Sequence, residues 1–136
     1  MPLDVSVVTP EREVWSGEAN FVVARSEGGE VGVLPGMAPF LGALRHSALK
    51  IEPSDGGEIY MAAHGGFIEV FEDRVTVLTP VAEIGTEIDV ARAQSAKERA
   101  EAALKTEETP EEIENQRRAE ARLRAAAAAS GGTLYD

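Results

Sequence analysis

Hydrophobic and polar residues alternate along the first half of the chain with the period of a β-strand. Leu3, Val5 and Val7 are separated by Asp4 and Ser6, so one side of this segment would face a core. Glycine pairs and acidic turn residues separate further short runs that are rich in valine, isoleucine and aromatic residues. These runs cover residues 21–24, 58–63, 67–71 and 74–78. Many short strands predict an all-β sandwich or flattened barrel.

The pattern becomes helical after Asp89. Alanine, glutamate, arginine and lysine, which favour helices, dominate from there, and neither glycine nor proline occurs before Pro110. Asp89 can cap one helix that runs to about residue 105. Thr109 and Pro110 offer the cap and the first residue of a second helix, which the glycine pair at 131–132 would end. Two helices joined by a few residues are expected to form an antiparallel hairpin.

The contact between the two predicted helices is thin. Because alanine has little surface to bury, at about 25 cal/mol per Å² the contact stabilises much less than a leucine seam would. We therefore expect a sandwich over residues 1–86 and a hairpin over 87–136 that can detach or extend. The residues expected to face each other are Val90, Ala93, Ala100 and Leu104 on the first helix and Ile113, Leu123 and Ala127 on the second.

Composition narrows the classes of function. The chain has 136 residues, with 13 basic against 24 acidic residues and a formal net charge of -11. This charge opposes binding to nucleic acid or to anionic lipid. The absence of cysteine excludes disulfides and thiolate metal sites. No apolar run reaches the roughly 18 residues of a membrane span, and no secretion signal is evident, so we expect neither a nucleic-acid partner nor direct membrane insertion.

No group of residues has the pattern of an active site. His46 and His64 are isolated in the sequence and lack the spacing of metal ligands, so we expect both to lie at strand ends. No serine stands in the sharp turn that activates a nucleophile. The sequence therefore predicts a non-catalytic protein without a metal site.

The segment "EVGVLPGMAPFLGAL", residues 30–44, is unusually apolar for an acidic protein. Pro35 and Gly36 predict a type II turn. We expect Val33, Leu34 and Leu41 to be buried in the sandwich. An exposed apolar patch with polar groups at its rim often binds a partner. The residues expected at the exposed tip are Glu30, Met37, Ala38 and Phe40.

Three segments, in this order, resemble the epsilon subunit of bacterial F-type ATP synthase: "GGEVGVLPGMAPFLGAL", "HGGFIEVFEDRVTVL" and "EIDVARAQSAKERAEAAL". The resemblance covers nearly the whole chain, and the combination of "LPG" with "GGF" is its most specific part. It implies a β-sandwich of about ten strands, followed by a helical hairpin that regulates the catalytic hexamer. The implied role is that of a non-catalytic central-stalk subunit of the rotor. Family members commonly have histidine where this chain has Met37.

The resemblance also implies partners. One apolar sheet face would bind the gamma subunit, and the tip residues Glu30, Met37, Ala38 and Phe40 would meet the membrane c-ring. The second helix, when extended, would contact the alpha/beta catalytic hexamer and inhibit ATP hydrolysis. Its basic residues for that contact are Arg117, Arg118, Arg122 and Arg124, which can alternatively pair within the helix. The isolated chain would be a monomer, and the complex would lie at the cytoplasmic face of a bacterial membrane.

The segment "EIDVARA", residues 87–93, matches a nucleotide-binding signature of some bacterial epsilon subunits at Ile88, Asp89, Arg92 and Ala93. No cofactor is required, and ATP would be a regulatory ligand. A folded hairpin would add arginine forks for phosphate oxygens, and a carboxylate would accept from adenine or ribose. A capped helix start with solvated arginines is an equally open interpretation. The further residues of the predicted site are Glu83, Arg99 and Arg122.

The alternative function is a free-standing β-sandwich that binds a ligand and carries a helical interaction tail. A sugar-binding module would display aromatic side chains for stacking. Aromatic residues make up 5% of this chain, however, and Trp15 is its only tryptophan. A rotor subunit accounts for the sandwich, the apolar loop and the weak hairpin together, so we favour it.

Overall fold

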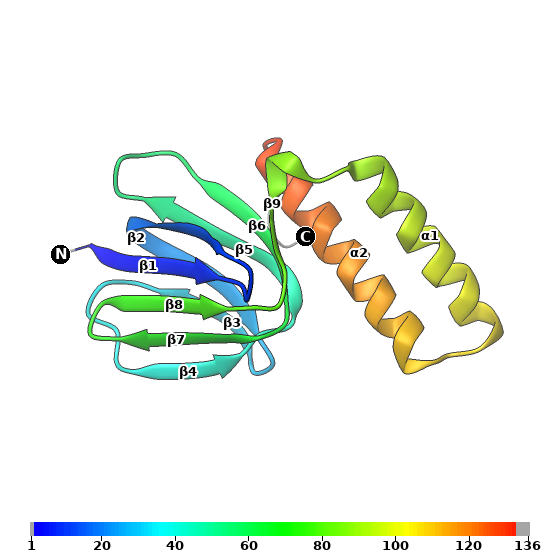
Figure 1. Ribbon diagram of the computed structural model, residues 1–136, viewed down its shortest axis with the longest axis horizontal. Helices are drawn as coiled ribbons and strands as arrows, with labels where there is room; N and C mark the ends of the chain where they lie inside the picture. Colours follow the sequence, from blue (N-terminus) through cyan, green and yellow to red (C-terminus); the bar gives the residue numbers. More distant parts are fainter. Residues whose placement is uncertain (1, 133–136) are drawn as a thin grey trace.

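The computed structural model describes residues 2–132 as a β-sandwich followed by two helices (Figure 1). This confirms the predicted fold class, with nine strands in the described residues where about ten were expected. A single 3₁₀ turn, η1 (Gly85–Glu87), leads from the sandwich to α1 (Val90–Thr106) and α2 (Pro110–Ala129). The strands are β1 (Leu3–Val8), β2 (Glu13–Ser26), β3 (Gly29–Val33), β4 (Phe40–Ala43), β5 (His46–Pro53), β6 (Ile59–His64), β7 (Phe67–Phe71), β8 (Arg74–Leu78) and β9 (Ala82–Ile84).

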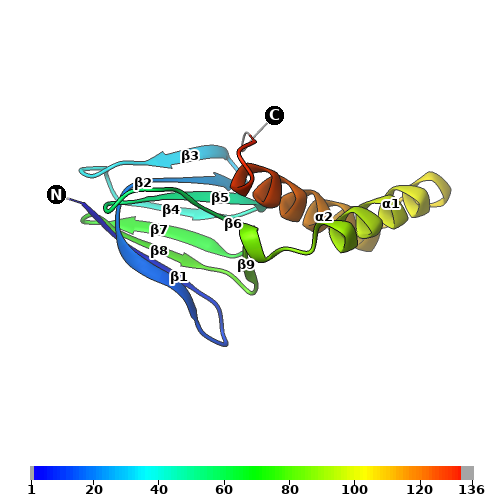
Figure 2. The ribbon, with the colours of Figure 1, turned by 90° about the horizontal axis from the view of Figure 1, so that it is seen from above.

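The strands form one sheet that folds over on itself into two layers (Figure 2). Their order is β4-β7-β8-β1-β2-β5-β6-β9, and β3 pairs with β2. The long strand β2 belongs to both layers, because its first half pairs with β1 and its second half with β5. The register shifts between Ala19 and Phe21, where β2 passes from one layer to the other.

The predicted alternation of β1 is confirmed. Leu3, Val5 and Val7 are fully buried, as expected for the inward face of a half-buried strand. They contact one continuous core of valine, isoleucine, leucine and methionine side chains between the two layers. Leu49, Ile51, Met61, Ile68, Val70, Val75 and Val77 are among its fully or almost fully buried members.

The loop between β3 and β4 contains the predicted turn. The amide of Met37 donates to the carbonyl of Leu34 at 3.3 Å, and Gly36 has a φ of +87°, which is the conformation that a type II turn needs at its third residue. The neighbouring β7–β8 turn has positive φ at Glu72 and Asp73, typical of a tight type I′ hairpin. Asp73 Oδ1 accepts from the Gly36 amide at 2.7 Å, which ties the two turns together.

The burial prediction for this loop is wrong at two positions. Val33 is buried, but Leu34 is 57% exposed and Leu41 is 68% exposed. In β4 the inward positions are those of Phe40 and Gly42, and a shift of one residue moves a side chain to the opposite face of a strand. Phe40 and Met37 instead pack partly buried against the core. The exposed apolar atoms therefore belong mainly to the two leucines.

Both helices have the predicted caps. The Asp89 side chain accepts from the Arg92 amide at 3.0 Å, and the Thr109 hydroxyl accepts from the Glu112 amide at 3.2 Å. The second helix ends at Ala129 with Ser130 as its C-cap, and Gly131 follows with positive φ. These bonds satisfy amides that have no partner within the helix.

The helix seam differs in part from the prediction. Ala93 and Ala100 are buried, whereas Val90 is 52% exposed and Ala127 is also exposed. The helix α2 lies between α1 and the sandwich (Figure 1), so its alanines divide between two neighbours. Ala121 and Ala125 pack on the sheet, and Ala127 faces neither surface closely enough to be buried.

Candidate nucleotide and hairpin-docking site

The helix α2 rests on β5 and β6 through small side chains. Ala48 and Ala62 from the strands meet Ala121 and Ala125 from the helix, and each is at most 1% exposed. Gly85 of η1 also lies close to α2, because a Cβ at this position would lie 2.6 Å from the carbonyl oxygen of Ala125. The absence of long side chains lets helix and sheet approach closely, but it leaves little apolar area to hold them together.

A pocket of about 330 Å³ opens where the docked hairpin meets the end of the sandwich. Residues from β9, from η1 and from both helices form its walls. All seven residues predicted for nucleotide binding line it, so the fold brings together residues as distant as 83 and 122. The full lining is Glu83, Glu87, Ile88, Asp89, Arg92, Ala93, Ala96, Arg99 and Arg122.

Arg122 already has a partner in this pocket. Its Nε donates to Oε1 of Glu83 at 2.7 Å, which links α2 to β9. Arg92 and Arg99 come from α1 and are exposed. An arriving phosphate would therefore find two accessible guanidinium groups, and it would share the third with Glu83.

A second groove, of about 390 Å³, continues from this pocket along the hairpin. It shares Ala96, Arg99 and Arg122 with the first pocket and adds Arg118. Arg118 donates to the side-chain oxygen of Asn115 at 3.2 Å.

The four arginines predicted to contact the catalytic hexamer do not share one face of α2. Arg118 and Arg122, which are four residues apart, line the groove. Arg117 is exposed and lies 3.5 Å from Glu114. Arg124 is half-buried. Residues four apart lie on the same side of a helix, whereas neighbours diverge, so the docked hairpin presents two separate sets of positive charge.

The two histidines are not isolated from each other, so the prediction from the sequence is wrong on this point. In the antiparallel pairing of β5 with β6, His46 lies opposite His64, and their Nδ1 atoms are 3.4 Å apart. The 18-residue separation with a glycine turn between them was the signal that could have predicted this pair. They do lie at strand ends, as expected.

Each histidine also contacts a carboxylate. Nε2 of His46 is hydrogen-bonded to Glu114 of α2, and Nε2 of His64 lies 2.8 Å from Oε1 of Glu83. A polar chain thus runs from α2 through both strands and β9 and returns to α2 at Arg122. Within residues 2–132, no three or more side chains of the metal-binding types are grouped to hold an ion.

These contacts shift pKa values. The hydrogen bond from His64, with a further contribution from Arg122, lowers the pKa of Glu83 to about 2, although burial opposes the change. Burial lowers the pKa of His46, and this outweighs the opposite effect of Glu114. The hydrogen bond to His46 lowers the pKa of Glu114. The carboxylates of Glu83 and Glu114 are therefore kept ionised while the hairpin is docked.

We expect Glu83→Gln to remove a pH-dependent stabilisation. Since the pKa of Glu83 is lowered from 4.5 to about 2, its contribution is fully present above about pH 4.5 and disappears as the pH falls toward 2. Because the carboxylate is 34% exposed, we discount the effect to about 1–2 kcal/mol at neutral pH. Urea unfolding at several pH values should show the difference between variant and wild type shrinking in acid. A constant difference would contradict the assignment.

The predicted partner surface lies along β3 and the loop that follows it. Glu30 is exposed and lies 4.0 Å from Arg25 of β2. Ala38 is exposed, whereas Met37 and Phe40 are partly buried. These residues border an edge of the sandwich, because β3 pairs with β2 alone among the strands of residues 2–132.

A second exposed surface is apolar. Leu41, Phe67, Phe71 and Leu78 are each at least 50% exposed, and they project from the adjacent strands β4, β7 and β8. We call this set the outer face. A hollow of about 400 Å³ beside it is lined by Pro39, Phe40, Leu41, Glu69, Val70 and Phe71.

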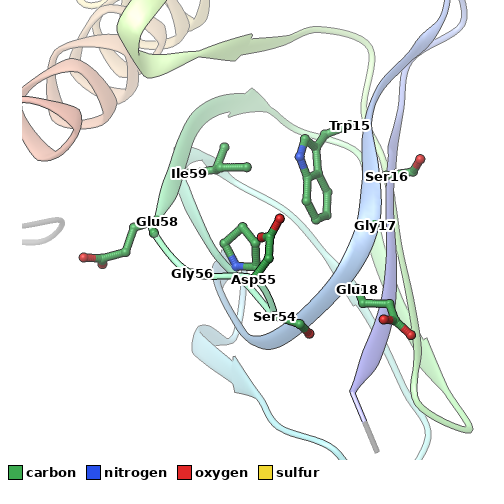
Figure 3. A pocket seen from close by; sticks show the side chains of 11 residues that line it. Trp15, Ser16, Gly17, Glu18, Ser54, Asp55, Gly56, Glu58 and Ile59 are labelled. Carbon is green, nitrogen blue, oxygen red and sulfur yellow. The ribbon is translucent and has the colours of Figure 1, made fainter.

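The tryptophan borders a separate open pocket of about 570 Å³. Figure 3 shows Trp15 and Ile59 on opposite sides of it, with Glu18 and Glu58 extending away. Glu58 accepts a hydrogen bond from the Tyr60 hydroxyl and forms an ion pair with Lys50. None of the residues predicted for nucleotide or partner binding lies here.

Comparison with known proteins decides the family. The description "ATP synthase, Delta/Epsilon chain, beta-sandwich domain" matches residues 2–85, and "ATP synthase, Delta/Epsilon chain, long alpha-helix domain" matches residues 86–128. The chain belongs to the ATP synthase delta/epsilon family. This confirms the resemblance found in the sequence and the expectation of a non-catalytic subunit of the central stalk.

Individual members of the delta/epsilon family are similar over most of the chain. The ATP synthase epsilon chain of Streptomyces coelicolor is 46% identical over 125 residues, which are 92% of this chain and 95% of that protein. The epsilon chain of Brevibacillus brevis is 45% identical over 102 residues, covering 75% of this chain and 77% of that one.

Solved structures share the fold. A chain in the Euglena gracilis mitochondrial ATP synthase matches with a TM-score of 0.73 at 23% identity, covering 95% of this chain and 81% of that chain. A chain in the central stalk and c-ring of the Tetrahymena thermophila enzyme matches with a TM-score of 0.54 at 15% identity, covering 80% and 98%. Among the described helices, none is long and apolar enough to cross a membrane.

Proposed function

We propose that this chain joins the gamma subunit to the c-ring in a proton-translocating ATP synthase and restrains ATP hydrolysis through its hairpin. ATP would be a regulatory ligand that favours the docked hairpin. The observation that carries the proposal is the convergence of Glu83, Asp89 and three arginines on one pocket, whose walls come from the end of the sandwich and from both helices of the docked hairpin. The complex would lie peripherally at the cytoplasmic face of a bacterial membrane.

The outer face is the surface that best fits the gamma subunit. Its four large side chains, Leu41, Phe67, Phe71 and Leu78, form an apolar patch on three adjacent strands. Exposed apolar patches on soluble domains commonly mark protein interfaces. Docking there would leave the β3 edge and the hairpin accessible to other subunits.

The β3 edge and its loop are proposed to meet the c-ring. Glu30 and Ala38 are exposed on this edge, and Leu34 adds an exposed apolar side chain between them. The bond between Gly36 and Asp73 would hold the loop in place. Met37 would contribute a soft, adaptable contact where relatives often use histidine.

In an assembled complex, we expect a cysteine at position 37, introduced as Met37→Cys, to form a cross-link to a c-ring subunit. The chain contains no other cysteine, so any product identifies this position. The matched control is Glu58→Cys, an exposed residue of the β5–β6 turn, which should give no such product. Cross-linking at both positions or at neither would contradict the proposed orientation.

We expect the isolated chain to bind ATP, measured as heat in isothermal titration. The triphosphate would lie against Arg92 and Arg99, which line the pocket and are exposed, and the loss of one charge-assisted contact costs about 1.5–3 kcal/mol. Arg92→Gln should therefore weaken binding by roughly tenfold or more. Lys97→Gln, on α1 outside the pocket lining, is the control. Absence of heat at millimolar ATP would leave Asp89 as a helix cap alone.

A further inference from the structure

The donor and acceptor atoms of the histidine pair do not balance when both rings are neutral. Each Nε2 lies beside a carboxylate, Glu114 for His46 and Glu83 for His64, so each Nε2 carries a hydrogen. A neutral imidazole has only one N–H, and both Nδ1 atoms would then be acceptors. Two acceptors cannot bond across the 3.4 Å between them. One additional proton, shared between the two Nδ1 atoms, gives every nitrogen of the two rings a hydrogen-bond partner.

A second additional proton cannot be accommodated in the same geometry. It would set N–H against N–H and place two positive rings with centroids 5.5 Å apart. Arg118, on α2, adds positive charge near His46, and Arg122 donates to the same oxygen of Glu83 that His64 contacts. Burial already lowers the pKa of the His46 ring. The two carboxylates offset part of this repulsion. Each of them contacts only one of the two rings, however, so neither can replace the hydrogen bond between the Nδ1 atoms.

The backbone leaves one way to relieve the repulsion. His46 and His64 are paired in the β5–β6 register, so their Cα atoms stay together while the sandwich is folded. His64 is almost fully buried, with 4% of its side chain exposed, whereas 15% of the His46 side chain is exposed. The His46 ring can therefore turn toward water, and in doing so it gives up Glu114 of α2.

We propose that this histidine pair is a proton-binding switch, which holds α2 on the sandwich with one shared proton and releases it when both rings are protonated. The alanine contact beneath α2 is small, so the polar chain supplies a large share of what holds the helix. The inference concerns docking in the isolated chain and does not depend on ATP binding or on inhibition of the complex.

The test measures the distance between α2 and the sandwich as the pH falls. Because the chain contains no cysteine, spin labels on Glu111→Cys and Glu69→Cys, both exposed positions, report docking alone. From about pH 7.5 to about pH 5, a range that spans histidine titration, we expect the detached fraction to rise at least about tenfold. The sandwich should remain folded, as reported by Trp15, the only tryptophan.

His46→Gln is the matched variant, because glutamine can hydrogen-bond to Glu114 but does not titrate. Its detached fraction should change less than about twofold over the same pH range. The proposal is overturned by a pH-independent distance in the wild type, by wild-type pH dependence in the variant, or by detachment only with unfolding of the sandwich.

Ring nitrogen spectra give a second readout that needs no substitution in the pair. The chain has 2 histidines, so every imidazole nitrogen signal belongs to this site. We expect the signals to show one shared proton while the helix is docked, and uptake of the second proton in the same pH range as detachment. Two fully protonated rings in a chain that keeps the docked distance would overturn the switch.

Discussion

Gly66→Ala should destabilise the sandwich more than Gly65→Ala or Gly85→Ala. A Cβ at this position would lie 1.9 Å from the carbonyl oxygen of Leu78 and 2.8 Å from Cα of Thr79. Both are backbone atoms, so no side chain can rotate away. Gly66 also has a φ of +93°, which alanine adopts at a cost. We expect a loss of roughly 3–5 kcal/mol in the free energy of unfolding.

The adjacent glycine provides the control for this prediction. Gly65 has a φ of +83°, but a Cβ there would meet nothing within 4 Å. Gly65→Ala should therefore cost only the backbone strain, about 1–2 kcal/mol. Urea unfolding followed by the fluorescence of Trp15 measures both variants. Equal losses in the free energy of unfolding would show that the β8–β9 connection moves and relieves the steric contact at Gly66.

Gly85→Ala should release the hairpin although it replaces no residue of the polar chain. The new Cβ would lie 2.6 Å from the carbonyl oxygen of Ala125 and 3.1 Å from Cβ of Ala129. Since η1 is anchored to the sandwich, relief requires α2 to move outward. An overpacking cost of about 1–3 kcal/mol predicts roughly 5- to 100-fold faster exchange of α2 amides. Thr86→Ala, at the exposed neighbouring residue, should leave exchange unchanged.

The same variant tests the proposed inhibition. In an assembled complex, a hairpin freed from the sandwich is available to the catalytic hexamer, so Gly85→Ala should slow ATP hydrolysis relative to wild type. Removal of residues 89–136 should raise the rate of ATP hydrolysis above the rates of both the wild type and Gly85→Ala. Identical rates in the three complexes would contradict a regulatory role for the hairpin, whatever the exchange data show.

Local chemistry made much of the fold predictable from the sequence. Alternation fixed the inward face of β1, the proline and glycine at 35–36 fixed a turn, and Asp89 and Thr109 fixed two helix starts. Each of these signals depends on neighbouring residues and on well-known backbone preferences. The prediction that the nucleotide-binding residues lie together depended on the family resemblance and on the expected hairpin, because no local sequence pattern relates Glu83 to Arg122.

The errors arose where pairing between strands decides the outcome. The sequence predicts Leu41 inside the sandwich, but the register of β4 against β7 turns Phe40 inward. The sequence spacing predicts that His46 and His64 are isolated, although their strands pair them directly. The helical pattern predicts that Val90 and Ala127 lie in a seam between two helices, but α2 also packs on the sheet, which is a third surface. Register and layer contacts depend on the whole chain, so short windows of sequence do not reveal them.

The two layers of the sandwich share a single strand. Since β2 is hydrogen-bonded to β1 along its first half and to β5 along its second half, a lateral force on one layer reaches the other through peptide bonds as well as through side-chain packing. Sliding of the layers would require that strand to stretch or to lose ladder hydrogen bonds. In a rotating assembly, such a strand would make the sandwich stiff to shear, so that torque applied to the outer face is delivered to the β3 edge with little elastic loss.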